Sequence, residues 1–247
     1  MTTAVMAADL CTGFGPQTPR DISNVEGINE KLFDIAPEYT ALNLCNIHTH
    51  TNAEHKGPGF SLHVGDDQYG GYACNETANL TASELITPED MAYDKVKAGD
   101  TIEVHWVHSS CDIAPGAGLG SCLSDDCEDL KLRVETQVFL VVNDENAADF
   151  MEMTYDTTSG IKGPHQAKYI PDTTGDPVQF HGSTTGPSYT QEKCSPLEVT
   201  WSVRPQCMKV DINSLNAWAK SNNVFEETGS HGVRQLVTAP ELLAPIQ

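Results

Sequence analysis

One segment, LRVETQVFLVV at Leu132–Val142, most constrains the fold of this 247-residue chain. Its first half alternates apolar and polar residues, and its second half is apolar without a break. Alternation with a period of two is typical of a strand, and a short apolar run rich in β-branched residues is typical of a strand covered on both faces. The segment therefore predicts a central strand of a sheet that is buried on both sides.

Further strand signals extend this sheet. They lie at Leu42–Thr51, Asp100–His108 and Leu197–Val203. Each of these segments alternates and is rich in β-branched and aromatic residues. Long stretches rich in Gly, Pro and Asp separate the strands and are expected to be loops, at Gly57–Gly71, Pro115–Asp129 and Ile170–Gly186.

Helix signals are scarcer. The candidates are Glu84–Lys97 and Ile212–Ser221, and Asp211 or Asn213 is the expected capping residue of the second. No internal repeat or low-complexity linker divides the chain. We therefore expect a single domain over residues 1–247 of mainly β, β-rich α+β class, with a central twisted, largely antiparallel sheet, long loops and a few short helices.

The charge balance excludes one class of partner. The chain has 14 basic and 35 acidic residues, a net charge of −21. Such a surface repels phosphate backbones, which argues against nucleic acid as a partner. No segment approaches the roughly 18 consecutive apolar residues of a membrane-spanning helix.

Eight cysteines without a CxxC pair argue against a zinc ribbon or a thioredoxin-like redox site. Disulfides explain them better, and they predict a secreted, periplasmic or other oxidising compartment. The first residues, MTTAVMAADLC, lack the basic and apolar regions of a signal peptide. Either such a signal has been removed, or the inference of export fails.

Three histidines and a glutamate indicate a metal site. Within CNIHTHTNAEHK, residues 45–56, His48 and His50 are two positions apart, so on a strand their side chains share one face. His105 lies in the next predicted strand, and Glu103, two positions earlier, shares its face. Three neutral imidazoles with one open position are the ligand set of a catalytic zinc ion. Glu103 is placed to accept the second ring N–H of a ligand histidine.

The other histidines have plainer interpretations. His55 and His108 face away from this group and are interpreted as structural. The remaining four lie in loop-like sequence and are expected to be solvated: His63, His165, His181 and His231. An exposed imidazole titrates near neutral pH, so one of these four could shuttle protons, but the sequence does not choose among them.

Four segments in order, HTHTNAEH, IEVHWVH, CSPLEVTWSV and VDINSLNAW, resemble the core of the α-class carbonic anhydrases. In that family an HxH pair precedes a Glu-His pair and then a Glu-x-His-x-x-His segment on the neighbouring antiparallel strand. The phrases around AEHK and VHWVHSSC are most similar to the divergent δ-class carbonic anhydrases. The resemblance covers the core strands. It does not extend to the long loop Gly57–Gly99 or to the Cys111–Cys127 segment.

The resemblance implies a reaction and a cofactor. The reaction would be the reversible hydration of carbon dioxide to bicarbonate and a proton, by attack of a zinc-bound hydroxide. The ligands would be His48, His50 and His105, and Co²⁺ would be an acceptable substitute for Zn²⁺ because imidazoles bind both.

The resemblance also implies roles around the metal. Glu54 matches the family glutamate that orients a threonine hydroxyl, which in turn orients the hydroxide. Thr190 is the candidate threonine, although the Thr-Thr-Pro-Pro pattern of the family is lost here. Val107 and Trp201 match residues of the apolar carbon dioxide pocket, and ordinary core packing would explain them equally well.

The same strand pairing predicts a disulfide. If His50 lies opposite His105 on antiparallel strands, Cys45 lies opposite residue 110, and a Cys45–Cys111 bridge follows. A second bridge, Cys11–Cys194, would resemble one in secreted α-class enzymes.

Two other functions stay open. A cupin-type metalloenzyme would use His48, His50 and Glu54 as an HxH-x3-Glu motif, although no PxG-x2-H motif follows at Pro115. A secreted acidic protein that binds metal without catalysis would explain the charge but not the ordered histidines. The sequence leaves the oligomeric state open.

Overall fold

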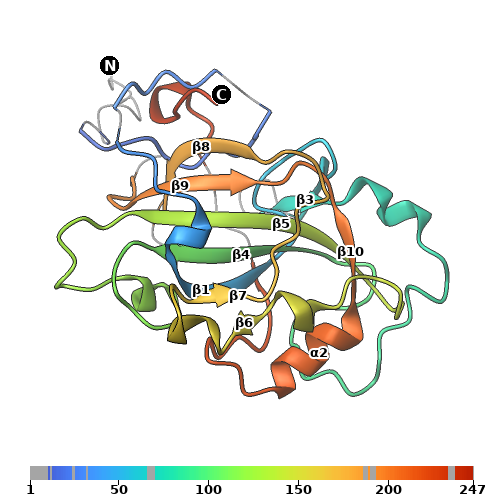
Figure 1. The fold of residues 1–247 in the computed structure, drawn as a ribbon. Coiled ribbons are helices and arrows are strands. Elements are labelled where there is room, and N and C mark those ends of the chain that lie inside the picture. Colours follow the sequence, from blue (N-terminus) through green and yellow to red (C-terminus); the bar gives the residue numbers. More distant parts are fainter. Residues whose placement is uncertain are drawn as a thin grey trace.

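The computed structural model describes residues 11, 13–23, 26–31, 33–65, 70–185, 189, 193–232 and 237–246. Its main feature is a seven-stranded sheet in the order β11–β1–β4–β5–β9–β8, in which β10 also pairs with β5 (Figure 1). The strands of this sheet are β1 (Asn43–Thr51), β4 (Thr101–Ser109), β5 (Leu132–Val142), β8 (Val178–Ser183), β9 (Glu198–Val203), β10 (Met208–Asp211) and β11 (His231–Gly232).

The sheet is mixed. Its three longest registers are antiparallel and join β1 to β4, β4 to β5, and β8 to β9. The strands β9 and β10 pair in succession with β5, both in parallel, and β11 pairs in parallel with β1. The expected mainly β class with a few short helices is confirmed.

The apolar segment Leu132–Val142 forms β5, in the middle of this sheet. All eleven residues of β5 are buried, as are all nine of β4. Their side chains alternate between the two faces of the sheet and contribute to two apolar clusters, one on each face. One cluster contains Trp106, Phe139 and Trp218, and the other contains Val107 and Trp201.

The single α-helix described is α2 (Ile212–Lys220), and its prediction is confirmed. It begins where the Asp211 side chain accepts a hydrogen bond from the backbone N–H of Asn213. The predicted helix at Glu84–Lys97 is wrong, since that segment is irregular. Pro88 interrupts it by removing a backbone donor, and Lys95 has a positive φ of 62° that a helix does not allow.

Short elements complete the described chain. The 3-10 helices are η1 (Tyr39–Ala41), η2 (Asn75–Asn79), η3 (Leu119–Cys122), η4 (Phe150–Met153), η5 (Ser159–Ile161) and η6 (Pro240–Leu242). Two-stranded sheets are formed by β2 (Leu62–Val64) with β3 (Gly71–Ala73), and by β6 (Tyr155–Asp156) with β7 (Gln166–Ala167). Two predicted loops were therefore partly wrong, because β2 lies in one and β8 in another. No helix among the described residues is long and apolar enough to cross a bilayer.

All eight cysteines form disulfides, as Cys11–Cys194, Cys45–Cys122, Cys74–Cys207 and Cys111–Cys127. The suggested Cys11–Cys194 bridge is present, and the predicted Cys45–Cys111 bridge is wrong. The cause is the register: His48, not His50, lies opposite His105, and a bulge interrupts the pairing at Cys45. Four disulfides indicate an oxidising, non-cytoplasmic compartment.

Candidate metal centre

Two adjacent central strands bring three imidazoles together. His48 and His50 share one face of β1, and His105 lies directly opposite His48 on β4. His48 Nε2 lies 3.2 Å from His105 Nδ1, and the three ring centroids are 4.9 to 5.2 Å apart. One nitrogen of each ring lies within 4.8 Å of the others. The predicted ligands therefore converge on one point.

Each of the three rings has an acceptor at its outer nitrogen. His48 Nδ1 contacts Asn46 Oδ1 at 2.7 Å, and His105 Nε2 contacts Glu103 Oε1 at 2.6 Å. His50 Nδ1 lies 2.9 Å from Glu54 Oε1.

Acceptors at these positions hold the proton on the outer nitrogen. The inner nitrogens, Nε2 of His48 and His50 and Nδ1 of His105, are left with lone pairs that face one another. This arrangement fits a metal ion bound by neutral imidazoles.

The electrostatics favour the neutral rings. Removal from water, together with the neighbouring imidazoles, holds the pKa of His48 well below its usual value. Burial also lowers the pKa of His105, although Glu103 opposes this effect. Neutral imidazole is the form that binds a metal, so the site is ready for a cation at neutral pH.

Glu103 holds two imidazoles at once. It is fully buried on β4, and besides His105 it accepts the Nδ1–H of His55 at 2.8 Å and the His55 backbone N–H at 3.3 Å. Burial opposes ionisation of Glu103, but His55 and His105 outweigh it and hold the pKa well below the usual range. His55, Glu103 and His105 form a second group of metal-binding atoms. In this group the carboxylate is already engaged by three N–H donors, which favours a supporting role.

Glu54 lies between a ligand and a threonine. Its Oε1 faces the outer nitrogen of His50, and its Oε2 accepts a hydrogen bond from Thr185 Oγ1 at 3.3 Å. Burial opposes ionisation, but His50 lowers the pKa of Glu54 below its usual value. Thr190, the threonine predicted for this contact, lies outside the described residues. Thr185, two residues after β8, is the threonine that the structure places beside Glu54.

An apolar cavity of about 290 Å³ opens beside His48 and His105. Val107 and Trp201 both line it. The remaining walls are mostly aliphatic and come from β5, β9 and the η3 segment: Leu119, Leu123, Leu132, Val134, Leu197 and Val199. Thr185 also lines this cavity, which places a hydroxyl where the cavity meets the imidazoles.

Comparison with known proteins identifies the family. A family model described as "Delta carbonic anhydrase" matches residues 39–214, which include every residue of the centre described above. The chain belongs to the delta carbonic anhydrase family. A comparison with curated protein sequences found no match.

Solved carbonic anhydrases, two of them described as α-class, have low similarity to this chain. That of Thermovibrio ammonificans, in complex with sulfanilamide, has 13% identity over 91% of this chain and 86% of its own, with a TM-score of 0.30. A halotolerant carbonic anhydrase from Dunaliella salina has 14% identity over 97% and 90%, with a TM-score of 0.34. The Photobacterium profundum enzyme has 15% identity over 92% and 88%, with a TM-score of 0.28. At these scores the similarity supports no residue-by-residue correspondence.

Membership of the carbonic anhydrase family decides between the functions that the sequence left open. The cupin alternative needs Glu54 as a metal ligand, but Glu54 contacts the outer nitrogen of His50, on the side away from the converging lone pairs. A metal-binding protein without catalysis is not favoured either, because hydration of carbon dioxide is the reaction of the family.

Three of the four histidines predicted to lie in loops are instead on strands of the described structure. His231 on β11 pairs with His50 of β1, and its half-exposed ring lies 6.3 Å from the His50 ring. His63 is exposed on β2, and His181 lies on β8 against Phe33. His165 bonds to Tyr155. Among these four, the structure places only His231 beside the imidazole group.

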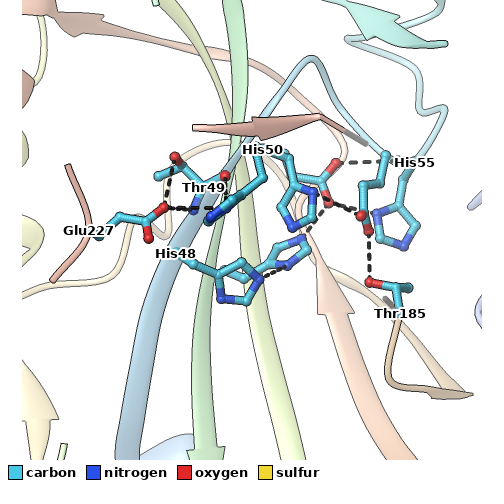
Figure 2. Close-up of polar contacts among 10 residues, drawn as sticks. His48, Thr49, His50, His55, Thr185 and Glu227 are labelled. Carbon is cyan, nitrogen blue, oxygen red and sulfur yellow. Dashed lines mark hydrogen bonds and ion pairs between the residues drawn. The ribbon is translucent and has the colours of Figure 1, made fainter. Parts of the chain in front are cut away.

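Two residues were not predicted from the sequence, Asn46 on β1 and Glu227 in a distant segment. Asn46 contacts His48 from two positions away on the same strand, a spacing that alternation could have revealed. Glu227 is buried, and its Oε1 accepts the Thr49 backbone N–H at 3.0 Å (Figure 2). Burial raises the pKa of Glu227 to about 7. It lies 178 residues from Thr49 in the chain, and no local pattern announces the contact.

Proposed function

We propose that this carbonic anhydrase hydrates carbon dioxide at a zinc ion held by His48, His50 and His105. The observation that carries the proposal is the convergence of three imidazoles beside an apolar cavity, each with its outer nitrogen on an acceptor. When bound there, zinc would lower the pKa of a coordinated water to about 7 and so supply a nucleophile at neutral pH. Co²⁺ would fit the same three imidazoles.

The surrounding acceptors keep the ligands in one tautomer. Asn46, Glu54 and Glu103 each hold a proton on the outer nitrogen of one ring, which orients the ring and raises the basicity of its inner nitrogen. Glu54 also accepts a hydrogen bond from the Thr185 hydroxyl. Because the hydroxyl proton points at Glu54, the Thr185 oxygen is left as an acceptor towards the cavity, and it can orient a hydroxyl group there.

The cavity walls suit the substrate. Carbon dioxide has no net dipole and makes only weak hydrogen bonds. An apolar surface can therefore bind it, because such a surface holds water only weakly. Val107 and Trp201 lie on this surface near His105, whose ring is 5.1 Å from that of Trp201. A substrate held there would lie next to the point on which the three imidazoles converge.

The compartment follows from the disulfides. We place the protein in a secreted, periplasmic or other oxidising compartment, where four disulfides persist.

Stopped-flow hydration of carbon dioxide by the purified protein, with metal content measured on the same sample, tests the proposal. We expect about one zinc per chain and activity that a chelator removes and zinc restores. His50→Ala should lose both metal and activity, while the exposed His63→Ala is the matched control and should lose neither. A zinc-loaded protein without hydration activity would refute the proposal.

A further inference from the structure

We infer that the disulfide-closed loop Cys111–Cys127 positions the ligand His48, and that Asn46 carries this effect from the loop to the ring. The inference rests on the proposed function, because it takes His48 as a metal ligand. It adds a positioning role for a segment that otherwise contributes only walls of the cavity.

Asn46 bridges the ligand and the loop. Its Oδ1 accepts the Nδ1–H of His48 at 2.7 Å, and its Nδ2 donates to the Gly116 carbonyl at 3.1 Å. The side chain is buried, so neither contact is readily replaced by water. An amide supplies an acceptor for an imidazole N–H and a donor for a carbonyl on two separate atoms of one short side chain. The position of Gly116 therefore determines which way the Asn46 oxygen points.

The loop is fixed to β1 beside this bridge. The Cys111–Cys127 disulfide closes its base, and Cys122 is linked to Cys45, the residue before Asn46. The Cys45 carbonyl accepts hydrogen bonds from Gly116 N at 3.0 Å and from Ser121 Oγ at 2.9 Å. The Gly116 carbonyl is thereby held at a set distance from the strand that carries His48.

His48 needs this support more than the other ligands do. His50 and His105 are buried, so packing restricts their rings, whereas His48 is partly exposed at the edge of the cavity. A ring with fewer packing contacts depends more on its hydrogen bond for orientation. Loosening the loop should therefore weaken metal binding through Asn46, besides altering the cavity wall at Leu119 and Leu123.

A double-mutant cycle on metal affinity separates this route from general loosening. The variants are Asn46→Ala, the pair Cys111→Ser and Cys127→Ser, and all three together. Zinc affinity is measured by competition with a chromophoric chelator, and the visible spectrum of the Co²⁺-loaded protein reports the ligand geometry. The matched control is the pair Cys74→Ser and Cys207→Ser, which removes a disulfide that does not contact Asn46 or the loop.

We expect Asn46→Ala to weaken zinc binding by about 10- to 100-fold, the usual effect of losing a ligand's outer partner. Opening the loop should weaken zinc binding by about fivefold or more in the wild type and by less than about twofold with Asn46→Ala. It should also shift the Co²⁺ spectrum in the wild type alone. Opening the control disulfide should leave both readouts unchanged.

If Asn46→Ala does not fold, Asn46→Asp takes its place in the cycle. Aspartate keeps the acceptor for His48 but has no donor for the Gly116 carbonyl, so opening the loop should again have little further effect. Equal losses from opening the loop in both backgrounds, or no loss in the wild type, would overturn the inference alone. A folded wild-type protein that binds neither zinc nor Co²⁺ would overturn the proposed function and this inference with it.

Discussion

Replacement of Thr185 by alanine should slow carbon dioxide hydration sharply while leaving the metal in place. The Thr185 hydroxyl donates to Glu54 at 3.3 Å and lines the cavity beside the imidazoles, but it is not a ligand. Alanine removes the oxygen that would orient the nucleophile. Glu54 would keep its contact with His50, so the geometry of the three rings should survive.

The size of the effect follows from the geometry. Loss of one hydrogen-bonding group that acts at a reacting centre costs about 10²- to 10³-fold in kcat. The Thr185 contact is longer than a typical hydroxyl–carboxylate bond, so we expect the lower end, about 100-fold, or roughly 2.7 kcal/mol of barrier. The side chain is only half-buried, and the free energy of unfolding should fall by no more than about 1 kcal/mol.

Stopped-flow hydration with a pH indicator measures the rate, and metal analysis of each sample excludes loss of zinc. Thr185→Ser keeps the hydroxyl and should stay within a few-fold of the wild type. Thr184→Ala is the matched control, because Thr184 lines the same cavity but bonds to Ser195 and not to Glu54. Thr190→Ala tests the residue that the sequence resemblance favoured.

Wild-type kcat of Thr185→Ala at full metal content would refute an orienting role for Thr185. A loss of about 100-fold in Thr190→Ala but not in Thr185→Ala would also refute this role, because Thr190 would then be the orienting residue.

Three further changes test other parts of the centre. Glu103→Gln should weaken zinc binding by about 10- to 100-fold, measured by chelator competition. Glutamine has no negative charge and only one acceptor oxygen, whereas the carboxylate uses Oε1 for the His55 and His105 rings and Oε2 for the His55 backbone N–H. Unchanged affinity would contradict the role given to Glu103. Burial raises the pKa of Glu227 to about 7. The folded protein therefore keeps a proton on this carboxyl group that the unfolded chain loses near pH 4.5. The free energy of unfolding should consequently fall as the pH rises from about 4.5 to 7. Between pH 5 and pH 8, the free energy of unfolding measured with urea should fall by roughly 2 to 3 kcal/mol less in Glu227→Gln than in the wild type. An identical pH dependence in the two proteins would contradict this assignment. Val107→Phe fills the cavity and should lower kcat/KM by about tenfold or more at constant zinc content.

The parts of the centre that sequence predicted are those set by local periodicity. His48, His50, Glu103 and His105 lie on strands that were recognised from alternation, and the period of two fixed their faces. What alternation does not give is the offset between strands. The predicted register placed His50 opposite His105, whereas His48 occupies that position, and the bulge at Cys45 shifts the pairing again.

The remaining parts depend on contacts between distant segments. Thr185 follows a strand that its sequence, VQFHGS, does not clearly announce, and Glu227 reaches the edge of β1 from a segment near the end of the chain. The incorrect prediction of a helix at Glu84–Lys97 has a simpler cause, since Pro88 already disfavours a helix there.

The bulge at Cys45 has a consequence for how the chain is made. A strand that slips by one residue turns every side chain to the opposite face, so a slipped β1 would carry His48 and His50 away from His105. The same slip would turn Cys45 away from Cys122, and their disulfide could not close. The Cys45–Cys122 disulfide can therefore close only in the β1–β4 register that brings the three histidines together. A chain with a slipped β1 would keep Cys45 and Cys122 as free thiols even in an oxidising compartment.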